Sequence, residues 1–457
     1  MSFNLKALVL IFGFLLRGYI SHGQETYPIL ENYIKAGISN NSALKTQQFD
    51  LEKSYTALEQ AKTLFMPQVN FQMQYTLAAG GRTLNFPIGD LLNPVYNTLN
   101  RLTQSNNFNT VENANINFLP NHFHETKIHT VYPILNKEIL YNREVRKELI
   151  SVEQIKINVY KRELVKNIKM AYIQYLQAQK AVDIYKNALG LVNENLRVNQ
   201  KLVKNDVALN SVVLKAKSEV SKVENSIVET ENNAKNAAAY FNFLLNKPFD
   251  SKIEIDEKLL KTNNNAVISV QKQANIAQNC EELAQLQSGQ KAASLLLKLN
   301  ESYKTPKIGA SLDVGFQGFG FKVWDKQAYV LLGLQMDLPI YTAGNSKLKI
   351  QQTQLDLKKL DAQKNEITQQ IELQIQIAKT NLETAQKALV VNEAELASSR
   401  EYYRIIERRY REGQALQIEL TDARTQLTAS ELKQSLSQFA ILLRGIELER
   451  AEASYKF

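Results

Sequence analysis

Two parts of the chain alternate apolar and polar residues in the way that is typical of β-strands. The first part consists of residues 67–78 and 127–134, and the second consists of residues 306–316 and 328–340. Runs of about ten residues with this alternation fit strands that cross a bilayer in a β-barrel, although half-buried strands of a soluble sheet look the same. We therefore predict two strand pairs. Aromatic residues near the strand ends are expected to form a membrane girdle: Tyr132, Phe319, Phe321, Trp324 and Tyr329.

A long helix is predicted after the second strand pair, because the chain runs from Gly344 to Gly413 without another glycine or proline. Positions in this helix follow the alternating spacing of three and four residues that coiled coils use: Leu382, Ala385, Leu389, Asn392, Leu396, Ser399, Tyr403, Ile406 and Tyr410. The first half of the chain repeats the spacing at Tyr175, Ala178, Val182, Tyr185, Leu189, Val192, Leu196, Asn199 and Val203. A helix of about 69 residues reaches ~100 Å, which exceeds the width of a compact domain.

The order helix, strand, strand, long helix, turn, helix occurs twice, as expected for an internal duplication. Pro133 and Pro339, near the ends of the two strand pairs, are 206 residues apart. The same offset aligns the helix-breaking segment 204–210 with residues 410–416. Under this offset the two coiled-coil stripes are one residue out of step, so the repeated helices need not present identical faces.

The N-terminal residues have the features of a signal peptide. Lys6 precedes the short apolar run 7–16, and the small residues Ser21 and Gly23 stand where a signal peptidase would cut. A buried N-terminal helix is the alternative. We expect an exported protein with a signal peptide at 1–23, a first repeat at 24–246, a linker at 247–265 and a second repeat at 266–457.

The charged residues and the cysteine exclude several classes of function. The formal net charge of +9 is spread along the chain with no run of five basic residues, so we do not expect nucleic-acid binding. Cys280 is the single cysteine, which excludes an intrachain disulfide and is interpreted as a helix-packing residue. The chain lacks a nucleophile elbow, a phosphate loop, an HExxH motif and a dinucleotide fingerprint. We therefore predict that the protein is not an enzyme, with no catalytic residue and no cofactor.

His122, His124 and His129 form a histidine cluster close to a predicted strand. A His-x-His arrangement can bind a metal ion, but neither a cysteine nor a clear set of carboxylates completes the ligands here. Surface histidines near the end of a loop are the simpler interpretation, so no metal site is predicted.

The duplicated order and two local motifs resemble the TolC-type outer-membrane efflux protein family. The first motif is the junction LPIYTAGNSKLKIQQTQLDL at 338–357. The second motif, YREGQALQIELTDARTQLTASE at 410–431, is similar to the family's Tyr-x-x-Gly turn followed by a leucine-containing, acidic helix. The resemblance covers about residues 27–455.

The resemblance implies a mixed α and β membrane protein. Three chains would each contribute four strands to one 12-stranded outer-membrane β-barrel, which would be continuous with a long α-helical coiled-coil tunnel in the periplasm. Four strands cannot close a barrel, and open strand edges are not viable in lipid. Physical reasoning therefore also requires an oligomer, while the number three comes from the family alone.

The implied function is that of an outer-membrane exit duct in a tripartite efflux or type I secretion system, passively conducting substrates to the outside. The implied partners are two further copies of the chain in a homotrimer, outer-membrane lipid, a periplasmic adaptor (membrane fusion) protein and an inner-membrane pump. The chain would be a multi-pass outer-membrane protein with its helices in the periplasm. The alternative is an exported structural or adhesive coiled-coil protein of the cell envelope without a conduit.

The resemblance also implies a pore gate at Tyr410, Gly413, Glu419 and Asp422. Tyr410 and Gly413 match the family's turn, and the tyrosine would help to hold the helix tips together. Glu419 and Asp422 match acidic residues that ring the closed periplasmic mouth. Carboxylates around an axis would attract cations, whereas a solvated helix face with Arg424 nearby is the alternative interpretation.

The two acids have no acidic counterparts in the first half of the chain. Under the offset of 206 their counterparts are Val213 and Ala216, so only the second half carries the carboxylates. The family often has an arginine two residues after the turn glycine, and this position is Ala415 here. Arg408 or Arg411 would have to make the link between chains instead.

Overall fold

The structure is a computed structural model that describes residues 27–256, 280–320 and 325–456. The expected signal peptide, residues 257–265 of the predicted linker, the start of the second repeat, Phe321 and Trp324 lie outside the described residues. The chain divides into two compact units. One contains the described residues up to Lys53, of Ile150–Gln290 and of Lys359–Phe457, and the other contains those of Ser54–Leu149 and Lys291–Lys358. Each unit holds segments of both predicted repeats, so the units do not correspond to the repeats.

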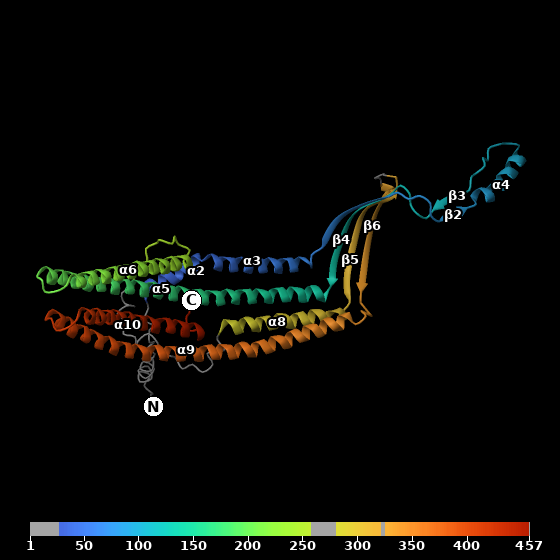
Figure 1. Cartoon of the computed structure of the whole chain (residues 1–457). Coiled ribbons are helices and arrows are strands. Elements are labelled where there is room, and N and C mark those ends of the chain that lie inside the picture. The colour runs from blue at the N-terminus through green and yellow to red at the C-terminus, as the bar shows by residue number, and fades with distance from the viewer. Residues whose placement is uncertain (1–26, 257–279, 321–324, 457) are drawn as a thin grey trace, which may run out of the picture. The chain divides into compact units, whose positions relative to one another are not determined.

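The second unit is built on an antiparallel sheet (Figure 1). Its strands are β1 (Gln68–Thr76), β4 (Phe123–Leu135), β5 (Lys307–Phe319) and β6 (Ala328–Asp337). Their order among the described residues is β1-β4-β5-β6, so the pairing of β4 with β5 joins the two predicted strand pairs into one sheet. The outer strands β1 and β6 each have a partner on one side within this sheet.

The two faces of this sheet differ in chemistry, as the alternation predicted. One face exposes large apolar side chains on all four strands: Val69, Phe71, Met73, Ile128, Leu312, Val314, Val330, Leu332, Leu334 and Met336. The register places mainly polar residues on the other face: Asn70, Gln72, Gln74, Glu125, Lys127, His129, Ser311, Asp313, Gln317 and Gln335. An exposed apolar surface of this extent marks contact with lipid or protein rather than with water. Tyr329 lies on the polar face, which corrects its expected place in the girdle, because it is opposite Gly315 and neighbours Glu125.

The connection between β1 and β4 contains elements that the sequence analysis did not predict. These are β2 (Thr83–Phe86), which pairs with β3 (Ala114–Asn117), and helix α4 (Ile88–Thr103). Two asparagines of α4 each bond both backbone groups of one residue in the returning segment. Asn93 bonds the N–H and C=O of Val111 at 2.8 and 3.0 Å. Asn100 bonds those of Phe108 at 3.1 and 2.8 Å. These two polar side chains of α4 therefore form hydrogen bonds within the connection itself.

The remaining helices are α2 (Pro28–Asn40), α3 (Ser42–Thr63), α5 (Lys137–Lys204), α6 (Asn210–Leu244), α8 (Glu281–Glu301), α9 (Asn345–Arg411) and α10 (Gln417–Ala451), with short 3-10 turns at Ser302–Lys304 and Asp325–Gln327. In the first unit α5 and α6 form one antiparallel hairpin, and α9 and α10 form another (Figure 1). Every position of both predicted coiled-coil stripes is buried or half-buried, which confirms the heptad spacing. None of the described helices has the length and the hydropathy to cross a membrane.

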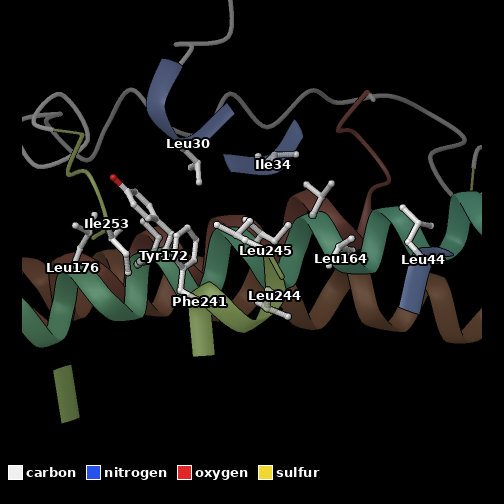
Figure 2. Packing of buried hydrophobic residues seen from close by; sticks show 14 of the residues in the cluster. Leu30, Ile34, Leu44, Leu164, Tyr172, Leu176, Phe241, Leu244, Leu245 and Ile253 are labelled. Atoms are coloured by element: carbon white, nitrogen blue, oxygen red, sulfur yellow. The ribbon is translucent and has the colours of Figure 1, made fainter. Parts of the chain in front are cut away.

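The core of the first unit surrounds Tyr172 of α5 (Figure 2). Phe241 and Ile34 are fully buried against it, as is Leu245 just after α6. The Tyr172 O–H donates to the Glu254 carbonyl at 3.0 Å and accepts the Asp256 N–H at 2.8 Å. Ile253, a residue of the predicted linker, also belongs to this cluster.

The helical hairpins repeat at an offset of 207 residues, not 206. Asp206 and Gly413 occupy the same left-handed position in their turns, and α6 and α10 begin at Asn210 and Gln417. The offset of 206 came from Pro133 and Pro339, which are not at equivalent positions, because Pro133 lies within β4 whereas Pro339 lies after the end of β6. The two coiled-coil stripes are therefore in step. Under the corrected offset the counterparts of the two acids are Val212 and Lys215 instead of Val213 and Ala216.

Candidate pore gate at the helix tips

The predicted gate residues lie around the turn between α9 and α10. Gly413 has φ +74°, and the open space around it shows that its backbone conformation, not crowding, favours glycine. The Gly413 N–H donates to the Tyr410 carbonyl at 3.1 Å, and the Gln414 N–H donates to the Arg409 carbonyl at 2.8 Å. This is a Schellman ending. Asp206 has φ 57° at the matching place after α5, where aspartate tolerates the left-handed conformation better than most residues do.

Tyr410 links the two hairpins directly. Its O–H donates to Oδ1 of Asn199 on α5, and Asn199 is fully buried. The Asn199 amide in turn donates to Asn195 Oδ1 at 2.9 Å. Burial raises the pKa of Tyr410 above its ordinary value, so the hydroxyl keeps the proton that it donates. The sequence placed Asn199 within an apolar stripe, where an asparagine is a signal for a buried polar contact, but it did not identify the partner.

A buried ion pair forms a second link between the hairpins. Arg424 of α10 lies with Nη2 3.0 Å from Oε2 of Glu219 on α6, and the two side chains are 10% and 8% exposed. Lys222 lies 2.9 Å and Lys215 lies 3.5 Å from the other carboxylate oxygen of Glu219. Arg424 itself is therefore buried rather than solvated. A third link runs from the Gln417 side-chain amide to the Val212 carbonyl at 3.0 Å.

Burial and the neighbouring charges shift the pKa values of Glu219 and Arg424 in opposite directions. Burial raises the pKa of Glu219, but the hydrogen bond from Lys222 and the charges of Lys222 and Arg424 outweigh it and hold the pKa below its usual value. Burial lowers the pKa of Arg424, and the charge of Glu219 opposes this. An arginine remains protonated under such shifts, so the link is an ion pair at neutral pH.

Glu419 and Asp422 are both exposed in the single chain. Oε2 of Glu419 accepts the Leu416 N–H at 2.9 Å, so this carboxylate also caps the start of α10. Arg411 is one of the two arginines considered as substitutes for the family's arginine, which is absent at position 415. Its Nη2 lies 2.6 Å from Oε1 of Glu407 on the same helix. Assignment of Tyr410, Gly413, Glu419 and Asp422 to a gate stays a prediction.

Polar layers interrupt the apolar contact between α9 and α10. The Asn392 side-chain amide donates to Ser437 Oγ, and the hydroxyls of Ser399 and Ser430 lie 2.9 Å apart, with all four side chains buried. Apolar clusters lie on either side of these layers. Buried polar pairs of this kind fix the register of neighbouring helices at some cost in stability.

The three histidines do not come together. His122 Nδ1 lies 3.1 Å from the Tyr75 hydroxyl, and the buried His124 Nε2 lies 3.1 Å from Gln327 Oε1. His129 points to the opposite face of the sheet, where it bonds Asp313. Within the described ranges, no group of three or more His, Cys, Asp or Glu side chains is arranged to hold a metal ion.

The sequence model of the family described as "outer membrane efflux protein" matches residues 274–451. No curated protein matches the chain. Among solved structures, the Campylobacter jejuni CmeC outer membrane channel matches with a TM-score of 0.74 at 12% identity, covering 93% of this chain and 85% of that chain. VceC of Vibrio cholerae matches with a TM-score of 0.70 at 13% identity, covering 93% and 95%. The open state of the Neisseria gonorrhoeae MtrE channel matches with a TM-score of 0.71 at 14% identity, covering 93% and 89%.

These comparisons confirm the resemblance that the sequence motifs indicated. The chain has the mixed α and β fold of outer-membrane efflux channels over nearly its whole length, and residues 274–451 carry the sequence pattern of that family. The similarity is to channels rather than to enzymes.

Proposed function

We propose that this protein is an outer-membrane exit duct that passively conducts substrates delivered by an inner-membrane pump through a periplasmic adaptor protein. The observation that carries the proposal is the two-faced sheet of β1, β4, β5 and β6. It exposes apolar side chains on one face and polar ones on the other, which is the pattern of a barrel wall between lipid and a water-filled lumen. A tripartite efflux or type I secretion system would use such a duct.

The sheet also supports assembly into a homotrimer. β1 and β6 present strand edges on their outer sides among the described residues, and such edges cannot remain open in lipid. Pairing of β6 of one chain with β1 of the next would close three sheets into a 12-stranded barrel. The helical hairpins of three chains would then form the periplasmic tunnel, with Tyr410, Gly413, Glu419 and Asp422 at its closed end.

A structural or adhesive coiled coil without a conduit is the second candidate. The long hairpins would suit that role equally well. The apolar face of the sheet does not suit it, because a protein in water would cover Phe71, Leu332 and Leu334 rather than expose them.

Single-channel recording tests the proposal. We expect the full-length protein, reconstituted in planar bilayers, to give small discrete conductance steps, and we expect Tyr410→Phe to give larger ones because the link to Asn199 is lost. Light scattering of the same sample should give three times the subunit mass. A folded monomer, or a trimer that gives no discrete steps in either variant, would contradict the duct.

The β1–β4 connection is expected to lie outside the cell, because the helices lie in the periplasm in this proposal and both strand connections leave the opposite end of the sheet. Epitope tags inserted at the exposed Asn97 in α4 and near Gln317, at Gly320 just after β5, should be labelled by antibody on intact cells. A tag at Asp206, in the turn after α5, is the matched control and should be labelled only after the outer membrane is permeabilised. The reverse pattern would overturn the topology.

A further inference from the structure

Five side chains form a connected charged cluster on the polar face of the sheet: Glu125, Lys127 and His129 of β4, Asp313 of β5 and Tyr329 of β6. Lys127 Nζ lies 3.0 Å from Oε1 of Glu125 and 3.1 Å from Oδ2 of Asp313. The Tyr329 hydroxyl donates to the same oxygen of Glu125 at 2.9 Å. His129 Nδ1 bonds the other oxygen of Asp313. The cluster crosses three strands, and none of its members belongs to the gate.

The backbone is shaped around this cluster. Gly315 lies opposite both Lys127 and Tyr329 in the sheet register. A Cβ atom at Gly315 would lie 2.2 Å from the Thr126 carbonyl oxygen and 2.7 Å from the Cα and Cβ atoms of Lys127. A side chain could not fit there, so glycine allows the charged residues of β4 to approach β5 and β6 closely.

The charge of the cluster depends on one histidine. Lys127 balances one of the two carboxylates, which leaves one net negative charge per chain when His129 is neutral and none when it is protonated. Asp313 and Lys127 are the charged groups near His129 on β5 and β4. The residue opposite His129 on β1 is Asn70, and the residue opposite Asp313 on β6 is Leu331, so neither outer strand adds a charge there.

We propose that this cluster faces the lumen of the assembled barrel and makes the ion selectivity of the channel depend on pH. The inference rests on the proposed outer-membrane duct, in which the apolar face of the sheet meets lipid and the polar face meets water. Three copies form a ring with three net negative charges when His129 is neutral and no net charge when it is protonated. The ring prefers inorganic cations at high pH and loses this preference at low pH, independently of the helix tips.

The test is the reversal potential in a KCl gradient, measured on the full-length channel at pH 8 and pH 5. The carboxylates at the helix tips are first neutralised by Glu419→Gln and Asp422→Asn, so that they add no titration of their own. In this background the cation-to-anion permeability ratio falls about threefold between pH 8 and pH 5, which corresponds to about one RT of electrostatic energy in a wide, water-filled lumen.

Variants separate His129 from other sources of pH dependence. His129→Gln keeps the ratio measured at pH 8 and removes its change with pH, while Asp313→Asn lowers the ratio at pH 8. His122→Gln, outside the cluster, behaves like the background. A pH dependence that persists in His129→Gln, or that is absent from the background itself, contradicts the proposed role of the cluster in ion selectivity. Conductance steps in the same experiment would still support the duct. If the wild-type protein gives no steps at all, it is the proposed duct that fails.

Discussion

Replacement of Glu219 by alanine is expected to raise the open probability of the channel strongly, and by more than Arg424→Met raises it. Glu219→Ala leaves the guanidinium of Arg424 buried without its carboxylate, and removal of one partner of a buried ion pair costs about 3–5 kcal/mol. Arg424→Met leaves Glu219 with Lys222 and Lys215, so we expect a cost nearer to about 1 kcal/mol. The pair joins α6 to α10, so either loss favours separation of the hairpins.

The size of the effect follows from the equilibrium between closed and open tips. Each ~1.4 kcal/mol changes an equilibrium about tenfold, so Glu219→Ala should raise the open population at least ~100-fold. The measurement is the open probability in planar bilayers. The matched control is Glu231→Ala, also on α6, because Glu231 pairs with Lys186 at 2.9 Å but the two side chains are 42% and 56% exposed. Such an exposed pair contributes little. If Arg424→Met opens as often as Glu219→Ala, the unpaired, buried guanidinium of Arg424 is not the cause of the increased opening.

Neutralisation of Glu419 and Asp422 together is expected to weaken block by multivalent cations and to shift selectivity towards anions. In the proposed trimer the two acids place six carboxylates around the axis, and a ring of this kind concentrates cations. The variant Glu419→Gln, Asp422→Asn is preferable to alanine, because a glutamine oxygen can still accept the Leu416 N–H that Glu419 accepts at the start of α10. The measurements are the reversal potential and the concentration of trivalent cation that halves the current.

Two further variants identify the source of any change. Glu412→Gln removes an exposed carboxylate from the same turn and should leave block and selectivity unchanged. Tyr410→Phe should raise conductance but keep the ion preference, because it removes a link between hairpins and no charge. If the double variant retains its cation preference and its block, the two acids are a solvated helix face and the gate lies elsewhere.

Elements whose signal is local could be predicted from the amino-acid pattern. Apolar and polar residues alternate with period two in the strands, and the stripes of α5 and α9 follow the coiled-coil spacing, so both kinds of element and their buried faces could be predicted. Helix-breaking residues indicated where the hairpins turn, because Gly413 adopts a left-handed conformation that ends α9. These features depend on residues within a few positions of each other.

The contacts between residues far apart in the chain depend on the packing of the folded protein. Tyr410 contacts Asn199 and Arg424 contacts Glu219 across more than 200 residues of chain, and nothing in the local pattern around either residue names the partner. The same holds for Lys127 and Asp313, which become neighbours only through the pairing of β4 with β5. Periodicity reports which face of an element is buried, whereas the register between elements is set by packing, so the site contacts could be read only from the fold.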